Sequence, residues 1–302
     1  MLTQTLPIRD DNPAVVLEAY VLKNSREFQA DVRRPAVIIC PGGGYLFTSD
    51  REAEPVALRF LAAGDHTFVL RYSVGTRFPQ PMHDLARAMT LLREHADEWF
   101  LDPERIALCG FSAGGHLAAA LGVMWQEPWL SSPLGVDAQA LRPSALILGY
   151  PAIDLDLIDN APRPNAFDPA AEAMRVRDLV LATVLGGADQ AEQDRYRLDR
   201  QVSTSTPPTF LWHTADDDLA FVQNSLRFAL SLAEKGVPHE LHVFESGVHG
   251  LSLADATTDD GGRMLNPDVQ VWVDLALKWL QRREQPRGTG QAQGAVVSEG
   301  LR

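Results

Sequence analysis

The chain has 302 residues, of which 45% are hydrophobic and 22% are charged, a composition usual for a soluble globular enzyme. Its 40 acidic and 27 basic side chains give a formal net charge of −13. An acidic chain without a basic block binds phosphate backbones poorly, which argues against nucleic acid as a partner. No apolar run reaches the ~18 residues that a membrane span needs, so we expect no membrane partner either.

The first ten residues and the cysteines bear on the compartment. Residues 1–10 lack the basic start and the apolar stretch of a signal peptide, so we expect a cytoplasmic protein. The two cysteines, Cys40 and Cys109, are too few for a disulfide framework or a four-thiolate zinc site. Both lie at the ends of apolar runs, and we expect them to be buried free thiols.

Strand-like and helix-like segments alternate from about residue 35 to residue 281, which predicts an α/β fold with a mostly parallel sheet. The opening stretch departs from this alternation and is expected to add antiparallel edge strands at 15–17 and 19–22. The remaining strands are expected at 37–40, 67–72, 105–110, 144–150, 209–213 and 239–244. The helices are expected at 55–63, 81–99, 113–125, 219–235 and 268–281.

We expect residues 1–285 to form a single domain with one small insertion. Residues 152–208 separate two strands that should be adjacent and parallel, although a crossover needs only about a dozen residues. This insertion contains a helical stretch near 170–185, and insertions over the carboxyl edge of a sheet commonly cover a ligand crevice. Residues 286–302 are rich in Gly, Gln and Ser, and we expect them to be a disordered tail.

The sequence Gly110-Phe111-Ser112-Ala113-Gly114 predicts a nucleophilic serine. A strand precedes it and a helix follows it, which is the context that a nucleophile elbow requires. The serine must occupy a sharp turn, and side chains two positions away on either side would collide with the neighbouring strands and helix. The alternative is an ordinary glycine-rich turn between a strand and a helix.

A serine nucleophile needs a histidine base further along the chain, after an acidic residue. The histidines downstream of the elbow are His116, His213, His239, His242 and His249. His249 lies in a glycine-flanked loop after the last expected strand, where its ring can reach Ser112. His116 lies in the helix that leaves the elbow, and packing is its expected role.

The acid is expected among Asp216, Asp217 and Asp218, which follow the strand at 209–213. One of the three should hydrogen-bond His249 and fix its tautomer. The other two are expected in a solvated turn or as a helix cap, and Asp218 precedes the next helix as a cap would. A calcium loop is a weaker alternative, because no Asp-x-Asp-x-Asp-Gly pattern is present.

Backbone donors for an oxyanion are expected from two places. One is the amide of Ala113, directly after the nucleophile. The other is the loop Pro41-Gly42-Gly43-Gly44-Tyr45, whose glycines let the backbone turn its N–H groups toward a reacting carbonyl. Taken alone, this loop would equally suit a plain tight turn.

Together these motifs resemble those of the α/β-hydrolase superfamily, and they are most similar to its bacterial carbohydrate-esterase and acetyl-xylan-esterase-like branch. The resemblance spans roughly residues 36–282 and implies an α/β-hydrolase fold with helices on both faces of the sheet. The matching pieces are Pro41-Gly42-Gly43-Gly44-Tyr45, Gly110-Phe111-Ser112-Ala113-Gly114-Gly115-His116, Trp212-His213-Thr214-Ala215-Asp216-Asp217 and Gly247-Val248-His249-Gly250. Relatives often carry His where Pro41 stands, so the oxyanion loop is the part that departs from the pattern.

The resemblance also implies roles for individual residues. It places the acid on Asp217 rather than Asp216, and it makes Gly43 and Gly44 the oxyanion donors beside Ala113. Ser112 would then attack an ester carbonyl while His249 accepts its proton, a reaction that needs no metal and no organic cofactor.

Our leading hypothesis is a serine carboxylesterase acting on short-chain acyl esters, in particular O-acetyl groups on sugars or xylo-oligosaccharides. Tyr45 and Phe47 are expected to wall the acyl pocket, unless they pack on the insertion. The expected partner is a small-molecule or oligosaccharide ester, and a homo-oligomer is possible. A lipase-like or aryl (feruloyl-type) esterase is the alternative. A serine peptidase is less favoured because no β-propeller or other large gating domain is recognisable, and an inactive binding protein because Ser112 and His249 are both retained.

Overall fold

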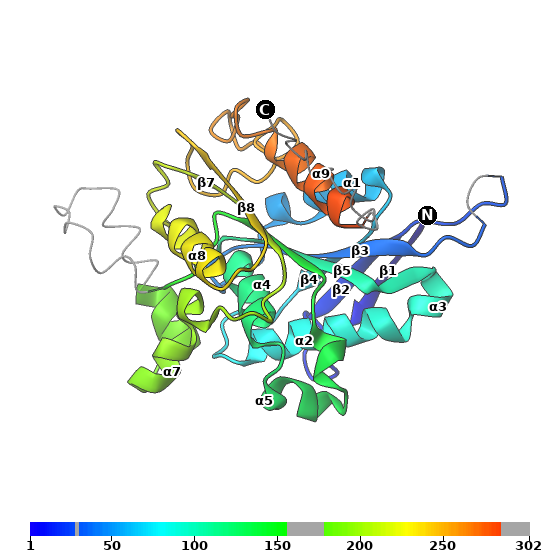
Figure 1. The fold of residues 1–302 in the computed structure, drawn as a ribbon, viewed down its shortest axis with the longest axis horizontal. Coiled ribbons are helices and arrows are strands. Elements are labelled where there is room, and N and C mark those ends of the chain that lie inside the picture. The colour runs from blue at the N-terminus through cyan, green and yellow to red at the C-terminus, as the bar shows by residue number, and fades with distance from the viewer. Residues whose placement is uncertain (28–29, 156–177, 285–302) are drawn as a thin grey trace, which may run out of the picture.

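Eight strands form one sheet through the centre of the protein, in a computed structural model that describes residues 1–27, 30–155 and 178–284 (Figure 1). In sheet order they are β1 (Leu2–Pro7), β2 (Val16–Val21), β4 (His66–Arg71), β3 (Arg34–Cys40), β5 (Leu101–Phe111), β6 (Ala145–Gly149), β7 (Thr209–Thr214) and β8 (His239–Phe244). β1 with β2 and β2 with β4 pair antiparallel, and every other neighbouring pair is parallel. The expected mostly parallel sheet is confirmed.

The central strands are largely buried because helices cover both faces of the sheet. β6 and β7 are buried at every residue, and β3 is buried over its last five. Side chains of adjacent residues in these strands enter two separate cores, one on each face. Cys40 and Cys109 are buried free thiols in different cores, and Cys109 pairs in register with Ile39.

The helices form two layers around the sheet (Figure 1). α1 (Glu54–Ala63) and α9 (Trp272–Glu284) pack on one face, whereas α2 (Gln80–Glu94), α4 (Ser112–Met124) and α8 (Gln223–Glu234) pack on the other. The shorter helical segments are η1 (Asp50–Glu52), α3 (Ala96–Trp99), α5 (Pro128–Ser131), η2 (Ser132–Leu134), η3 (Ala138–Leu141), α7 (Gln190–Arg195) and η5 (Leu198–Gln201). The expected helices on both faces are confirmed.

Several boundaries differ from those expected. The two edge strands expected at 15–17 and 19–22 are the single strand β2, which pairs with β1. β1 alternates between half-buried and exposed residues, so its apolar signal is weak. The helix expected at 81–99 is divided into α2 and α3 at His95. α8 begins four residues later than expected, because the backbone before it is engaged by a carboxylate described below.

The insertion contributes a helix over 178–185 whose residues lie over the carboxyl edge of the sheet. The backbone nitrogen of Phe78 donates to the carbonyl of Val184 in this helix at 3.0 Å. The first half of the helix expected near 170–185 and the tail expected at 286–302 lie outside the described residues, and the single domain over 1–285 stays a prediction. In the part of the chain that the structure describes, no helix is both long and apolar enough to cross a bilayer.

Candidate active site

Ser112 directly follows β5, at the turn from that strand into α4. Its φ of 51° lies in the left-handed region, which side-chain-bearing residues rarely adopt. A Cβ on Gly110 would lie 2.3 Å from the carbonyl oxygen of Gly114, and a Cβ on Gly114 would lie 2.0 Å from that of Cys40. The expected reason for glycine on both sides of the elbow is therefore confirmed.

Ser112, His249 and Asp217 form a continuous hydrogen-bonded series. The Ser112 Oγ lies 2.9 Å from His249 Nε2, and His249 Nδ1 lies 2.8 Å from Asp217 Oδ2. An ionised carboxylate can only accept, so the Nδ1–H donates to Asp217 and Nε2 is left to accept the Ser112 hydroxyl. Ser112 directly follows β5, whereas Asp217 and His249 lie in the loops after β7 and β8. All three strands end at the carboxyl edge of the sheet.

Asp217 also shapes the loop after β7. Its Oδ1 accepts the backbone N–H groups of Leu219 at 3.0 Å and Ala220 at 2.9 Å. The expectation that Asp218 caps the following helix is wrong, because Asp217 takes the backbone donors and α8 starts only at Gln223. The second oxygen of Asp217 is thereby free to face His249 while the carboxylate stays only 3% exposed.

Charges shift the pKa values of this pair in opposite directions. Burial alone would raise the pKa of the Asp217 carboxyl, but the charge of His249 and hydrogen bonds from His213 and His249 hold it well below its ordinary value. Burial alone would lower the pKa of His249, whereas nearby carboxylates, above all that of Asp217, raise it above 6.5. Asp217 therefore stays ionised beside an imidazole that takes up a proton readily.

Asp216 lies on the other side of the same loop and is exposed. Its Oδ1 accepts the backbone N–H of Gly247 at 2.6 Å. The hydroxyl of Thr214 donates to the carbonyl of Gly247 at 2.7 Å. The backbone N–H and carbonyl of Gly247 are therefore both hydrogen-bonded to residues at or just after the end of β7. Gly247 lies two residues before His249, so these contacts fix the loop that carries His249.

The three expected oxyanion donors, Gly43, Gly44 and Ala113, border the same hollow as Ser112. Their amide nitrogens donate to no acceptor among the described residues. Gly43 has a φ of 123°, and a Cβ there would lie 2.2 Å from the carbonyl oxygen of Phe47. Only glycine fits that turn, which leaves unpaired N–H groups beside the Ser112 hydroxyl.

The hollow around Ser112, called the Ser112 pocket below, has a volume of about 330 Å³. Phe47 lines it as expected, and so do apolar residues of the insertion helix. The described lining residues are Gly43, Gly44, Leu46, Phe47, Ser49, Arg51, Glu52, Ser112, Ala113, Ala152, Asp154, Leu155, Val180, Leu181, Leu219, Ala220, Asn224, His249 and Gly250.

Tyr45 is absent from this lining, contrary to the expectation that it walls the acyl pocket. The side chain is fully buried, and its ring meets that of Phe78 edge-on at 5.1 Å. Its hydroxyl lies 2.8 Å from Nδ1 of His116, whose Nε2 faces the carbonyl of Tyr196 at 3.2 Å. With a φ of 60°, the backbone turns the ring into the core, and His116 has the packing role expected of it.

Sequence reasoning missed two buried polar residues beside the Ser112 pocket, Glu52 and Tyr150. The Tyr150 hydroxyl donates to Glu52 Oε1 at 2.7 Å, and the other carboxylate oxygen accepts the N–H of Gly42 at 2.6 Å. Tyr150 directly follows β6 at the carboxyl edge, which is a weak positional signal. Nothing in the sequence around Glu52 marks it.

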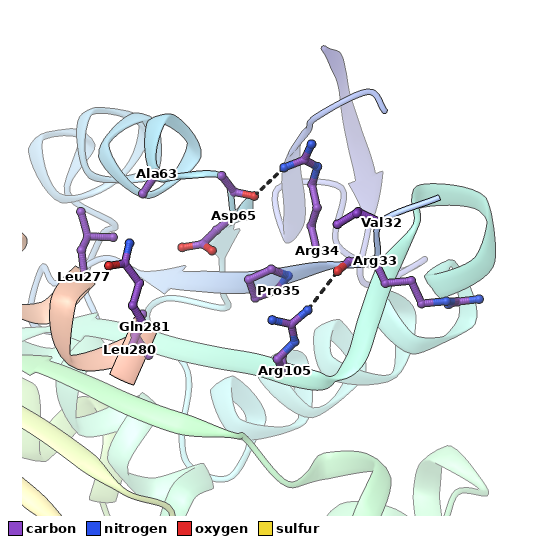
Figure 2. A pocket seen from close by; sticks show the side chains of 11 residues that line it. Val32, Arg33, Arg34, Pro35, Ala63, Asp65, Arg105, Leu277, Leu280 and Gln281 are labelled. Atoms are coloured by element: carbon purple, nitrogen blue, oxygen red, sulfur yellow. Dashed lines mark hydrogen bonds between the residues drawn. The ribbon is translucent and has the colours of Figure 1, made fainter. Parts of the chain in front are cut away.

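A second hollow lies at the opposite, amino edge of the sheet and has a volume of about 210 Å³ (Figure 2). Two of its arginines hydrogen-bond backbone carbonyls. Arg34 donates to the carbonyl of Gly64 at 3.3 Å, and Arg105 donates to the carbonyl of Arg33 at 2.9 Å. Among the described residues that line it, none is a serine, cysteine or histidine. This hollow therefore lacks the chemistry that the Ser112 pocket contains.

Comparison with known proteins identifies the family of this chain. A profile of the family described as BD-FAE matches residues 20–232, which include Ser112 and Asp217 and end before His249. The chain belongs to this family of α/β hydrolases. Endo-1,4-beta-xylanase B of Butyrivibrio fibrisolvens is 32% identical over 74% of this chain and 34% of its own length. The chain spans only 34–46% of the first three curated relatives that it matches.

Solved structures agree over nearly the whole chain. The carboxylesterase Cest-2923 of Lactobacillus plantarum has a TM-score of 0.79 at 31% identity, covering 94% of this chain and 98% of its own. An acetyl ester-xyloside bifunctional hydrolase of Caldicellulosiruptor lactoaceticus has a TM-score of 0.75 at 32% identity, covering 93% and 96%. The expected α/β-hydrolase fold is confirmed. Ester hydrolysis is the activity that the names of these two proteins give to them.

Proposed function

We propose that this protein is a serine carboxylesterase that removes short acyl groups, in particular O-acetyl groups of sugars or xylo-oligosaccharides. The observation that carries the proposal is the series of hydrogen bonds from Ser112 Oγ through His249 to Asp217, at 2.9 Å and 2.8 Å. In this reading the three residues are a catalytic triad with a nucleophile, a general base and an orienting acid.

The first half of the reaction forms an acyl-enzyme. Ser112 Oγ attacks the ester carbonyl as His249 Nε2 takes the hydroxyl proton, and Asp217 stabilises the resulting imidazolium. His249 then gives the proton to the leaving alcohol as the carbon–oxygen ester bond breaks. In the second half, water attacks the acyl carbon as His249 takes its proton. His249 then returns that proton to Ser112 Oγ as the acyl–oxygen bond breaks, and the carboxylic acid leaves.

The oxyanion of both tetrahedral intermediates would be held by the amides of Gly43, Gly44 and Ala113. These N–H groups have no other acceptor among the described residues, so they cost no reorganisation when charge develops on the substrate oxygen. One such donor contributes about 3–4 kcal/mol to the transition state in a comparable site.

The lining of the Ser112 pocket favours an apolar acyl group. Leu46, Val180 and Leu181 form walls next to the oxyanion loop, and a Cβ on Gly44 would lie 3.2 Å from Val180. The polar Asn224 is already paired within the protein, since it accepts from Asp154 N at 2.9 Å and donates to the Phe221 carbonyl at 3.0 Å. The relative from Caldicellulosiruptor lactoaceticus, named an acetyl ester-xyloside hydrolase, supports acetyl among apolar acyl groups.

The same apolar walls leave a lipase-like or aryl (feruloyl-type) esterase as the second candidate. A cavity of about 330 Å³ exceeds what an acetyl group alone would fill, so a longer or aromatic acyl group has room. Chain-length preference separates the two candidates. The cytoplasmic location and the homo-oligomer stay predictions from the sequence.

The deciding experiment is hydrolysis of para-nitrophenyl esters from acetyl to dodecanoyl, with acetylated xylo-oligosaccharide alongside and Ser112→Ala as the inactive control. The proposal expects fast acetyl cleavage that falls with chain length, together with acetate release from the sugar. Preference for long chains, or faster cleavage of a hydroxycinnamoyl ester assayed beside the series, would favour the second candidate. No cleavage of any ester would contradict the proposed function and favour a peptidase or a binding protein. Unchanged ester cleavage in Ser112→Ala would contradict the proposed role of Ser112 as the nucleophile.

A further inference from the structure

Glu52 is a buried carboxylate at the wall of the Ser112 pocket that takes no part in the proposed triad. It ends η1 and is 3% exposed. Among the described residues, no ion pair includes it. A buried carboxylate without a cation is costly, so the hydrogen bonds that it accepts must have a stabilising effect of their own.

One oxygen of Glu52 holds the start of the oxyanion loop. Oε2 accepts the N–H of Gly42 at 2.6 Å, immediately before Gly43 and Gly44. A Cβ on Gly42 would lie 2.9 Å from the Cβ of Ser112 and 2.7 Å from Glu52 Oε2. The carboxylate, the loop and the nucleophile are therefore packed against one another, and the position of Glu52 determines that of the loop.

The other oxygen of Glu52 holds the side of the pocket that carries His249. The Tyr150 hydroxyl donates to Oε1 at 2.7 Å and accepts the N–H of Ser252 at 2.9 Å. The Tyr150 ring meets the His249 imidazole edge-on, with 5.1 Å between centroids. The hydroxyl of Ser252 donates to the carbonyl of Arg51, next to Glu52, at 2.6 Å.

Strained backbone conformations gather around the Ser112 pocket, and two of them lie on residues that this network joins. Four non-glycine residues around the pocket have a positive φ, and they are Tyr45 at 60°, Ser112 at 51°, Tyr150 at 36° and Ser252 at 53°. Such conformations persist only where the surroundings enforce them. Glu52 contacts Tyr150 directly and Ser252 through the Tyr150 hydroxyl, which accounts for two of the four.

Glu52 also carries charge close to the imidazole. The carboxylates that raise the pKa of His249 are Asp217 first, then Glu52 and Asp218. Arg51 is the cation on this side, and its Nη1 donates to the carbonyl of Gly250 at 3.0 Å. Replacing Glu52 by a neutral residue would therefore lower the pKa of His249, which a purely structural contact would not do.

We propose that Glu52 is a positioning residue, whose two oxygens fix the oxyanion loop and the His249 side of the pocket relative to Ser112. This inference rests on the proposed function, because it assumes that the loop and His249 act on an ester. Glutamine can replace only part of the interaction, since its amide cannot accept from both Gly42 N–H and Tyr150.

The test compares Glu52→Gln with the wild type on para-nitrophenyl acetate across pH, and Glu54→Gln, an exposed carboxylate two residues on, is the matched control. We expect Glu52→Gln to lower kcat about 100-fold with little change in KM, because a displaced loop acts on the transition state. The acid limb of kcat/KM should move to lower pH. Glu54→Gln should match the wild type in both readouts.

Loss of rate with an acid limb that stays in place would overturn the proposal, because Glu52 would then only support the fold. A wild-type rate in Glu52→Gln would overturn it too. If Glu52→Gln does not fold, Tyr150→Phe removes the hydroxyl between Glu52 and Ser252 and keeps both the ring and the charge. It should lower kcat without moving the acid limb toward lower pH, and an unchanged kcat would contradict the proposal. Failure of the triad itself is read separately, from activity that remains in Ser112→Ala.

Discussion

The carboxylate of Asp216 accepts the backbone N–H of Gly247 at 2.6 Å, so the residue next to Asp217 holds the loop that carries His249. The two neighbouring carboxylates thereby act on the same loop in different ways. Asp217 bonds the imidazole, whereas Asp216 bonds the backbone two residues earlier. The geometry favours Asp217 as the acid of the proposed triad and gives Asp216 a supporting contact.

Asp217→Asn should therefore reduce kcat far more than Asp216→Asn. An amide at position 217 can present N–H to His249 Nδ1 and favour the wrong tautomer, which costs about 10⁴-fold in a comparable triad. Asparagine at 216 keeps an oxygen that can accept from Gly247, so we expect a loss below about tenfold. The measurement is the steady-state kcat of both variants on one acetyl ester, compared with that of the wild type. The reverse order would assign the acid to Asp216.

The turn at Ser112 and the approach of His249 to it were predictable from the sequence because their signals are local. Gly110 and Gly114 lie two residues from Ser112, between a strand and a helix, and the structure shows why each must lack a Cβ. His249 follows from its glycine-flanked loop after the last strand. The spacing of the sequence could not decide which of the three aspartates at 216–218 would bond His249. The prediction of Asp217 needed the family resemblance.

What the sequence could not predict depends on contacts between distant residues. Glu52 meets Tyr150 across 98 positions, and no local pattern encodes that pair. Tyr45 follows three glycines and was expected at the pocket, but a positive φ turns its ring into the core. β1 was missed because an edge strand with alternating half-buried residues carries little apolar signal.

Phe47→Ala should change acyl preference, whereas Tyr45→Phe should not. Phe47 lines the Ser112 pocket and is 58% exposed, so its removal widens the pocket beside the oxyanion loop. We expect the ratio of hexanoyl to acetyl kcat/KM to rise by about tenfold, because room for one more methylene of the acyl chain is worth roughly 1–3 kcal/mol. The measurement is that ratio in each variant.

Tyr45→Phe is the matched control for this prediction. It removes only the hydroxyl that contacts His116 in the core, so it should lower the free energy of unfolding by about 1–2 kcal/mol and leave the ratio unchanged. An altered ratio in Tyr45→Phe, or none in Phe47→Ala, would mean that the acyl group lies elsewhere in the pocket.

Two buried histidines should make the fold sensitive to acid. Burial lowers the pKa of His116 and of His66 to about 4. Between their ordinary pKa near 6.5 and pH 4 the unfolded chain binds more protons than the folded one, so stability falls as pH drops through that window. Each histidine adds up to about 1.4 kcal/mol per pH unit to the slope. Below pH 4 their contribution levels off.

Urea unfolding at pH 7, 6, 5 and 4.5 measures this slope. His116→Gln removes one titrating group from the contact between Tyr45 and Tyr196, so it should be less stable at pH 7 and show a shallower pH dependence. The replacement of an exposed histidine, His239→Gln, should leave the slope as it is. Equal slopes in His116→Gln and the wild type would show that His116 does not set the acid sensitivity.

Gly114→Ala should disrupt the contact between α4 and the end of β3. The new Cβ would lie 2.0 Å from the carbonyl oxygen of Cys40 and 2.3 Å from that of Pro41, and both are backbone atoms that cannot move without shifting the oxyanion loop. We expect a loss of stability well above the roughly 1–3 kcal/mol typical of overpacking, with little folded protein recovered.

Gly122→Ala, in the same helix, is the matched control. Its new Cβ would lie 2.6 Å from Leu146 Cδ1, a side-chain tip that can rotate away. It should remain folded and active, because the elbow is untouched. Thermal unfolding and acetyl-ester hydrolysis of the two variants provide the comparison, and a stable, active Gly114→Ala would mean that the elbow and the loop are less tightly packed than these distances indicate.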